Sequence, residues 1–564
     1  MVGHQKKKDL SQLFLVLAAL IVVNILSQFS FTRFDFTKEK RYTISPMSIQ
    51  LLSHLKDEVK VTVYLQGEFP AGFKRLRNAT KDLLSDDKAY AGSKLQFEFV
   101  DPMADKNQQE QEEEYITLTS KGIEPTNLSV KTESGLTQKM IFPYALVSCN
   151  GHEIPVKLLQ TRMGTNPEEV LNNSIQNLEY AFSSAIKKVS SGGKPVVVFT
   201  EGHGELNDLQ LHDALQSLSE GYEVGRIDLD KINEQGLSQI AVMIIDKPET
   251  AFSELEKYKL DQYLMRGGKI IWAIDQVNAD LDSMRHSRGE ELTFPKKLNL
   301  DDQLFTYGVR INYDLIGDMN CAQIPVSVGQ IGGQAQIQMV PWLFYPIIMP
   351  VSTHHPLVKN LDGIRTEFVN TIDTIGTKGT KKTILLTTSP FNRELDAPTM
   401  ISLDMIEDTP DPERFQSAPK AVCVLLEGQF KSDFLNRAVP EGIIGFSAPL
   451  TKSKYTKILV FSDGDVFKNQ ISEKDGSPFP LGFDRYTQQT YGNKTFLLNA
   501  VDYLTDDANL IALRSKEIKL RLLDKGKLVA DKLQWQLINT LIPLIILVLF
   551  GIFQHIYRKR KYAA

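Results

Sequence analysis

The sequence predicts an α/β protein whose soluble part lies between two membrane-anchoring helices. Three observations indicate this class. An apolar run near each end of the chain approaches the length that crosses a bilayer. Strand-like and helix-like runs alternate between these two ends. One strand-like run, Pro195–Thr200, is almost continuously β-branched or aromatic, which is typical of a parallel strand buried on both faces.

The C-terminal apolar run, Leu537–Phe553, predicts a membrane-spanning helix over residues 537–557. The basic cluster Arg558–Lys561 follows it, and basic residues beside a span stay on the cytoplasmic side. Trp535 stands at the other end of the run, where aromatic rings favour the headgroup layer. We therefore expect the chain before Trp535 to lie on the far side of the membrane until the chain crosses again.

The N-terminal apolar run, Leu10–Phe31, predicts a second membrane helix behind Lys6–Lys8. A cleaved signal peptide has the same charged start and apolar core, but no A-x-A-like cleavage site follows here. We therefore interpret the run as an uncleaved anchor. Two spans place both ends of the chain in the cytoplasm and hold a large periplasmic region between them.

The composition is that of ordinary globular material, with 42% hydrophobic residues, 24% charged residues and a net charge of −5. No domain is strongly basic and no recognition motif occurs, so we expect no nucleic-acid partner. The three cysteines, Cys149, Cys321 and Cys423, are too few and too widely separated for a disulfide framework. No Cys/His cluster has metal-binding spacing, and we expect no cofactor.

The first soluble domain is predicted to begin with a βαβ unit. Val59–Leu65 alternates as a strand, Phe73–Tyr90 has helical spacing, and Leu95–Val100 alternates again. The arrangement and size resemble a thioredoxin-like half, but the C-x-x-C redox motif is absent. Val170–Val189 is the strongest helical pattern, and Ser190–Gly193 forms a linker at which we place a domain boundary.

The chain after this linker predicts a doubly wound parallel sheet. Following Pro195–Thr200, the pattern continues with a strand at Val242–Ile245, a helix at Phe252–Met265 and a strand at Lys269–Ile274. Further strands are expected at Thr383–Thr387, Ala421–Leu426 and Lys457–Phe461. Ligands of such sheets bind at the carboxyl edge, where many of these strands end on polar residues, including Ser389 and Glu427. The predicted ligand or partner edge consists of Glu201, His203, Glu205, Asp246, Asp275, Asp463 and Asp465.

These residues match no catalytic motif. Gly202–Glu205 with His212 lacks the H-E-x-x-H spacing of a zinc site, and Ser462–Asp465 lacks the spaced oxygen ligands of a calcium loop. We interpret both as tight strand-to-helix turns, with His203 satisfied by the backbone. No G-x-S-x-G nucleophile elbow occurs, and Cys423 lies inside a strand. We expect no enzymatic activity; a true amidase or metalloenzyme is the disfavoured alternative.

Two further stretches have a different character. Ser327–Met339 is rich in Gly and Gln and is expected to be a loop, and the aromatic run Pro341–Pro346 after it packs on the domain or on a partner. The juxtamembrane segment is both apolar and basic, and we interpret it as a connector to a partner. Packing on its own domain, with basic side chains near lipid headgroups, is the alternative. The connector candidates are Arg514, Lys516, Lys519 and Arg521.

A series of short motifs, in this order between two anchors, resembles the auxiliary membrane subunit of the gliding-motility-associated ABC transporter (the GldG type). The motifs are Phe36–Ser45, Asn177–Tyr180, Glu201–Glu205, Tyr345–Pro346, His355–Leu361, Ser462–Asp465, Tyr491–Asn493 and Leu513–Lys525. The resemblance implies a subunit working beside a separate permease and a cytoplasmic ATPase, in bacteria that glide and secrete adhesins. It also implies a domain akin to glutamine amidotransferases without their chemistry.

The absence of a G-x-x-x-x-G-K-[ST] loop agrees with this resemblance, because ATP hydrolysis must then come from another chain. We therefore expect a non-catalytic, periplasm-facing subunit of an ABC complex associated with gliding motility and adhesin secretion. The alternative is a degenerate hydrolase-like domain that binds a glycan or peptide at the carboxyl edge. The expected segments are a cytoplasmic N-terminus (1–9), a span (10–31), two periplasmic domains (32–190 and 191–512), a connector (513–536), a span (537–557) and a basic tail (558–564).

Overall fold

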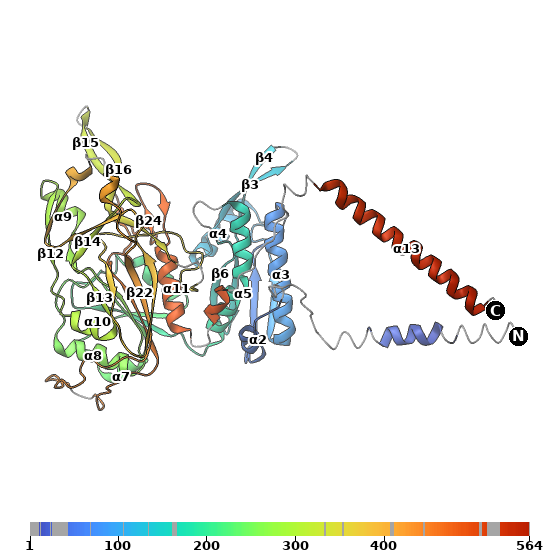
Figure 1. Cartoon of the computed structure of the whole chain (residues 1–564), viewed down its shortest axis with the longest axis horizontal. Coiled ribbons are helices and arrows are strands. Elements are labelled where there is room, and N and C mark those ends of the chain that lie inside the picture. Colours follow the sequence, from blue (N-terminus) through green and yellow to red (C-terminus); the bar gives the residue numbers. More distant parts are fainter. Residues whose placement is uncertain are drawn as a thin grey trace. The chain divides into compact units, whose positions relative to one another are not determined.

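The structure is a computed structural model of the whole chain (Figure 1). The residues described here are 11, 13–22, 24, 43–67, 69–104, 106–132, 135–160, 166–331, 334–351, 355–406, 411–443, 446–506, 510–515 and 531–562. The chain divides into two compact units, which we describe separately. One consists of Met1–Asp35 with Tyr42–Lys516, and the other of Phe36–Arg41 with Glu517–Ala564.

The larger unit begins with a four-stranded mixed sheet in the order β2–β1–β5–β6. Strand β1 pairs parallel to β2 and antiparallel to β5, so the predicted strand–helix–strand unit is present, with α3 as its helix. The elements of this part are α2 (Pro46–Ser53), β1 (Val59–Val63), α3 (Ala71–Ala91), β2 (Leu95–Phe99), α4 (Gln108–Ser120), β3 (Thr126–Thr132), β4 (Gly135–Ile141), β5 (Tyr144–Cys149), β6 (His152–Lys157) and α5 (Pro167–Ser190).

Helix α5 covers this sheet with a stripe that includes Leu178, Phe182 and Ile186, all buried in one core with β1. The helix starts where Asn166 accepts a hydrogen bond from the backbone of Glu169 and Pro167 occupies the first helical turn. Residues at three- and four-residue spacing share one face of a helix, which explains why this helix was the clearest in the sequence.

The second part of the larger unit is built on a ten-stranded sheet, in the order β15–β16–β19–β22–β23–β10–β9–β7–β8 with β17 beside β16. Its elements are β7 (Val196–Glu201), α6 (His212–Ser219), β8 (Glu223–Asp228), α7 (Glu234–Gln239), β9 (Ile240–Asp246), α8 (Glu254–Met265), β10 (Ile270–Ala273), β15 (Cys321–Ile331), β16 (Gln334–Pro350), β17 (Ile364–Arg365), β19 (Thr380–Thr387), β22 (Ala421–Gly428), β23 (Thr456–Phe461) and α11 (Asn493–Thr505).

Both faces of the sheet are buried. Alternate residues of β7 enter two different cores: Val197 and Phe199 pack with α6 and α11, while Val198 packs with α8 and α10 (Asp301–Tyr307). A strand covered by helices on both sides has no solvent-facing positions, and this accounts for the uninterrupted run of β7.

The prediction of a wholly parallel, doubly wound sheet is wrong for part of this domain. Strands β8, β7, β9, β10 and β23 pair parallel to one another, but β22 runs antiparallel to both β23 and β19. Glu427, near the end of β22, pairs with Lys457 at the start of β23 and therefore lies at the opposite edge. Antiparallel neighbours need no crossover helix, and the described residues between β22 and β23 contain none.

The Gly/Gln-rich stretch that was expected to be a loop is instead part of a long hairpin of β15 and β16 (Figure 1). The aromatic run in β16 packs on its own domain, because Trp342 and Phe344 are buried in a core with β14 (Asp314–Asp318). The remaining elements are β11 (Val277–Asn278), α9 (Leu281–His286), β12 (Glu290–Pro295), β13 (Val309–Ile311), β18 (Ile372–Thr374), β20 (Asn392–Asp396), β21 (Thr399–Ser402), β24 (Phe483–Asp484), β25 (Gln489–Thr490) and the short 3₁₀ segments Gly92–Lys94, Leu403–Ile406, Pro412–Arg414 and Leu510–Ser515 (η4).

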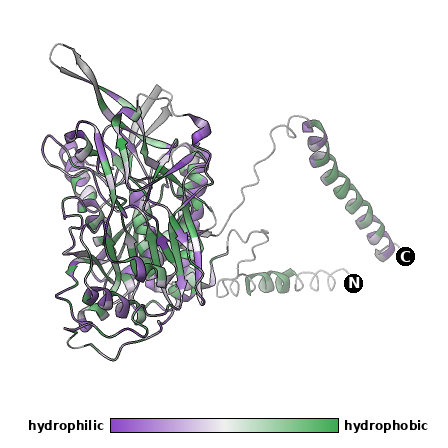
Figure 2. Ribbon diagram, turned by 60° about the vertical axis from the view of Figure 1, so that its left-hand side comes forward, coloured by the Kyte–Doolittle hydropathy of each residue, from purple (hydrophilic) through white to green (hydrophobic). Residues whose placement is uncertain are grey.

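The smaller unit contains helix α13 (Lys532–Tyr562), which extends beyond the predicted span 537–557 at both ends. Its segment Lys532–Arg560 is long and apolar enough to cross a membrane, and Figure 2 shows the apolar middle between hydrophilic ends. The other predicted span, Leu10–Phe31, is described only in part. Its described apolar helix, Leu13–Val22, is shorter than a bilayer-crossing helix, so two spans are not established.

Candidate functional site

The seven predicted edge residues lie at or just beyond the ends of parallel strands. Glu201 and Asp246 are the last residues of β7 and β9. Asp275 and Asp463 each follow the strands β10 and β23 by two residues, and the other three lie in the turns after β7 and β23. Because these strands are parallel neighbours, their carboxyl ends meet at one edge of the sheet.

Asp275, Asp463 and Asp465 form one buried cluster. The Asp275 carboxylate accepts a hydrogen bond from the backbone N–H of Gly464 at 2.6 Å. The Asp463 carboxylate accepts one from the N–H of Asp465 at 2.7 Å and another from the N–H of Glu367 at 2.9 Å. The turn after β23 is therefore closed by its own carboxylates, as the turn interpretation expects.

Lysine side chains neutralise this cluster. Both Lys247 and Lys468 bind Asp465, the latter at 2.9 Å. Burial alone would raise the pKa of Asp465, but these two ammonium groups hold it below its ordinary value. Among the described residues Asp463 has no such partner, and burial together with Asp275 and Asp465 raises its pKa well above the usual range. The ionised members of the cluster are thus paired within the chain.

Glycines shape the turn after β7. Gly202 and Gly204 have φ values of +118° and +82°, which favour residues without a Cβ. A Cβ on Gly204 would meet the Cβ of Glu249 at 3.0 Å. His203 lies between the two glycines, and its carbonyl oxygen accepts a hydrogen bond from the backbone N–H of Glu249 at 2.7 Å. These constraints explain the G-x-G spacing without a ligand.

The His203 side chain is held by carboxylates and an aromatic ring, not by the backbone as the sequence interpretation had it. Its Nε2 lies 3.2 Å from the Glu256 carboxylate, its Nδ1 lies 3.6 Å from Glu205, and its ring stacks on Phe252 with centroids 3.8 Å apart. Burial lowers the pKa of His203, but the two carboxylates outweigh it and raise the value to about 9. The imidazolium therefore ties the turn to α8.

The remaining two edge residues differ in exposure. Glu201 is half exposed and pairs with Arg226 at 3.3 Å. Asp246 is fully buried, and neither carboxylate oxygen has a hydrogen-bond partner. Burial raises the pKa of Asp246 well above its ordinary value, more than nearby Arg226 lowers it. A neutral carboxyl group at this position needs no counter-ion.

No metal arrangement emerges at this edge. His212 is the first residue of α6 and lies outside the His203–Glu205–Glu256 set of contacts. Within the described part of the chain, no group of three or more His, Cys, Asp or Glu side chains is placed to hold a metal ion.

A second cluster, which sequence reasoning did not assemble, surrounds helix α5. Glu179 accepts hydrogen bonds from the backbone N–H of Ser45 at 2.7 Å and from the Ser48 hydroxyl at 3.0 Å. The next residue, Tyr180, donates to the Asp502 carboxylate of α11 at 3.0 Å. Asp502 also accepts from Lys188 at 2.7 Å and from the Tyr222 hydroxyl.

The segment that follows α11 contacts α5 as well. The Arg514 guanidinium lies 5.4 Å from the centre of the Tyr180 ring and donates to the Lys359 carbonyl at 3.2 Å and to Asn499. We call this set of contacts around Glu179, Tyr180, Asp502 and Arg514 the α5 junction. Its signal in the sequence was four of the short motifs, at 36–45, 177–180, 355–361 and 513–525, which supply Ser45, Glu179 with Tyr180, Lys359 and Arg514.

Of the four connector candidates, the described residues include Arg514, which belongs to the α5 junction and so is not a free basic group. Lys516, Lys519 and Arg521 lie outside the described residues. Their role as a partner contact stays a prediction.

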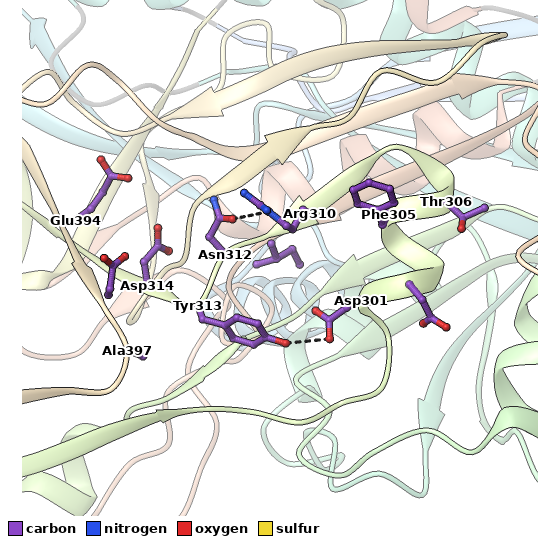
Figure 3. A pocket seen from close by; sticks show the side chains of 12 residues that line it. Asp301, Phe305, Thr306, Arg310, Asn312, Tyr313, Asp314, Glu394 and Ala397 are labelled. Atoms are coloured by element: carbon purple, nitrogen blue, oxygen red, sulfur yellow. Dashed lines mark hydrogen bonds between the residues drawn. The ribbon is translucent and has the colours of Figure 1, made fainter.

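A cavity of about 910 Å³ lies near the carboxyl edge, between α10, β13, β14 and β20 (Figure 3). Gln276, three residues past the end of β10, donates a hydrogen bond to its wall residue Asp301 at 3.3 Å. None of the seven predicted residues lines this cavity. The sequence offered no signal for it, because its wall combines short strands that are far apart in the chain.

Comparison with known proteins places most of the second domain in one family. A family described as an ABC-type uncharacterized transport system matches residues 194–500, more than half of the chain. The chain belongs to this ABC-type transport-system family. A domain of unknown function also matches residues 38–148.

Individual relatives add little to this family assignment. An uncharacterized protein of Borreliella burgdorferi is 23% identical over 579 residues, covering 99% of both chains. Two solved structures are also similar in part. The mmIFT52 N-terminal domain has 11% identity and a TM-score of 0.30, covering 58% of this chain and all of that one. A ThuA-like protein from Bacteroides uniformis has 12% identity and a TM-score of 0.27, covering 56% and 94%. At these scores we draw nothing from either structure.

Family membership makes this chain a transporter-associated protein, and α13 fits attachment to a membrane. The matched region of the family includes the whole carboxyl edge and most of the ten-stranded sheet. The GldG-type identity and the amidotransferase-like and thioredoxin-like labels remain resemblances.

We predict that His203 makes stability depend on pH. Its folded pKa of about 9 exceeds the ordinary 6.5, so its contribution is complete below pH 6.5 and is lost as the pH rises through 9. Over that interval the free energy of unfolding should fall by on the order of 2 kcal/mol more in the native chain than in His203→Gln. Unfolding of the full chain in detergent at several pH values measures this. The exposed-histidine variant His152→Gln should keep the native slope, and a native slope in His203→Gln would contradict the pairing.

We predict that Tyr180→Phe lowers the free energy of unfolding by about 1.5–3 kcal/mol, since it removes a hydrogen bond to the ionised Asp502. The control Tyr455→Phe alters a side chain that is 65% exposed and should change stability by less than about 0.5 kcal/mol. Urea unfolding of the full chain provides both values. Equal effects of the two substitutions would mean that the α5 junction contributes nothing specific.

Proposed function

We propose that this chain is a non-catalytic, membrane-anchored auxiliary subunit of an ABC transporter, with its two α/β domains in the periplasm. The observation that carries the proposal is the match of residues 194–500 to the ABC-type transport-system family. The chain contains no Walker A motif, so the ATPase is a separate subunit, and two spans are too few to form a transport path, so the permease is separate as well.

The orientation rests on the basic cluster at 558–561, which adjoins α13 and favours the cytoplasmic side. A second anchor at 10–31 then returns the N-terminus to the cytoplasm. The α5 junction binds Ser45, which follows the N-terminal segment, and Arg514, which precedes the C-terminal segment. A force on either anchor would reach the same helix.

A non-catalytic role is supported by the state of the carboxyl edge. Asp275 and Asp465 are paired with lysines, His203 is paired with two glutamates, and Asp463 accepts two backbone hydrogen bonds. Groups that already have internal partners are poorly suited to proton transfer or nucleophilic attack on a substrate. The resemblance to the GldG type extends the proposal to gliding motility and adhesin secretion.

We predict the topology from the positive cluster. A reporter that is active only in the periplasm should work when inserted at Ser191, in the exposed link after α5, and should fail when fused after Ala564. Enzyme activity of each fusion in intact cells, normalised to its expression, is the measurement. The opposite pattern would overturn the orientation.

We predict that the basic connector orients the permease. Reversing Lys516, Lys519 and Arg521 to glutamate should reduce the permease and ATPase recovered with the tagged full chain from solubilised membranes. The melting temperature of the chain should stay unchanged.

A matched control reverses three exposed lysines elsewhere in the larger unit, Lys74, Lys81 and Lys378. This control should recover the transporter subunits at the native level. Full recovery with the connector variant at moderate salt would show that the segment is only a spacer, whereas absence of any ABC subunit from the native pull-down would overturn the proposed function itself.

A further inference from the structure

The cavity between α10, β13, β14 and β20 has about 910 Å³ of space, at the upper end of the roughly 300–1,000 Å³ typical of small-ligand sites (Figure 3). Its wall belongs to short elements beside the carboxyl edge of the large sheet. Five carboxylates and two partly exposed aromatic rings are among the side chains of this wall.

Three carboxylates stand on one face of the strand pair β14–β20. Asp314 and Asp396 are directly opposite each other in the antiparallel register, and Glu394 lies two residues from Asp396 on the same face. Figure 3 shows Asp314 and Glu394 on the same side of the cavity. Like charges directly opposite across a strand pair destabilise it. Hydrogen bonds from Thr371 give Asp314 a structural role, so the member of the set that fold stability does not explain is Asp396.

The chain neutralises these carboxylates incompletely. Lys420 binds Glu394 at 2.8 Å, and the Thr371 backbone and hydroxyl donate to Asp314. Burial raises the pKa of Asp314, the hydrogen bonds from Thr371 offset this only in part, and the charges of Glu394 and Asp396 add a smaller increase. Asp396 is exposed and has no ion pair with any residue that the structure describes. A cation in the cavity would remove this repulsion.

Arg310, the one basic side chain among the described wall residues, does not neutralise these carboxylates. Arg310 donates to Asp373 at 2.7 Å and to Asn312 at 2.9 Å, so its charge is already paired. Asp302, another wall carboxylate, is paired with Lys257 at 2.7 Å and with Arg437 at 3.0 Å. The wall carboxylates without an ion pair among the described residues are therefore Asp314 and Asp396 on β14–β20 and Asp301 on α10, and Asp301 accepts hydrogen bonds from Tyr313 and Gln276.

The aromatic rings supply apolar surface next to this charge. Tyr313 is 37% exposed and Phe305 is 51% exposed, although both lie in the wall of the cavity. The Tyr313 hydroxyl donates to Asp301 at 2.9 Å, which fixes the direction of its ring (Figure 3). A ring beside a carboxylate suits a cation on an apolar stem, because the ring attracts the charge and packs against methylene groups.

We propose that this cavity binds the cationic side chain of a peptide segment, a lysine or arginine whose charge faces Asp396 and whose stem lies along Tyr313. The carboxylates exclude anionic ligands. This site goes beyond the transport role, and its test does not depend on recovery of the transporter subunits.

The experiment titrates the full chain, in a non-ionic detergent, with trilysine that is acetylated at its N-terminus and amidated at its C-terminus, and measures the heat of binding. Acetylation of all three lysine side chains removes the charge and should abolish binding. Raising NaCl from about 0.02 M to about 0.3 M should weaken it, because the site is partly exposed. Equal binding of the acetylated peptide, or no binding of trilysine at low salt, would overturn the proposal.

Asp396→Asn should weaken trilysine binding about tenfold, while the melting temperature stays the same or rises, because a repulsive charge opposite Asp314 is lost. The matched control Asp230→Asn changes another exposed aspartate and should leave affinity within about twofold. A fall in melting temperature with unchanged affinity would show that Asp396 is merely structural. Displacement of trilysine by a neutral chitooligosaccharide with higher affinity would assign the cavity to a glycan instead, and would equally overturn the cationic ligand.

Discussion

The larger unit depends on the hydrogen bonds that the carboxylate of Asp502 accepts. This carboxylate accepts hydrogen bonds from Tyr180 and Lys188 of α5 and from Tyr222, which precedes β8. These donors belong to the helix that covers the first sheet and to the edge of the second sheet. Removing an ionised acceptor from a buried network leaves several donors unpaired, so its contribution exceeds that of one bond. The same helix, α5, also binds Ser45 and Arg514.

Burial decides the chemistry of the carboxyl edge. In an open parallel sheet this edge is the usual ligand site, but here loops cover it and bring lysines and a histidine to its carboxylates. A buried ion pair stabilises little by itself, yet breaking one leaves an uncompensated charge. Such pairs therefore fix the geometry of the turns after β7 and β23 and do not require a ligand. The cavity beside this edge, by contrast, retains an exposed carboxylate, Asp396, to which no described residue is paired.

Local sequence patterns predicted those helices and strands whose own residues show a helical or strand periodicity. The stripe on α5, the alternation in β1 and the uninterrupted run of β7 all followed from helical or strand periodicity. The direction of β22 could not be predicted in this way, because the residues of a run such as Ala421–Leu426 favour a strand equally whether it pairs parallel or antiparallel to its neighbours. The β15–β16 hairpin was missed for a related reason: glycine and glutamine weaken the strand signal, and pairing with a neighbour compensates for it.

The sequence by itself determined the α/β class, the apolar tail with its basic flank, and the acidic residues that end the parallel strands, since each depends on residues close together in the chain. Tertiary structure alone decided what these residues do. Whether Asp465 is paired depends on Lys247, more than two hundred residues away in the sequence, and the α5 junction unites Ser45, Tyr180 and Arg514. Charges and hydrogen bonds act over a few ångströms of space, whatever the separation along the chain, so only the folded arrangement specifies their partners.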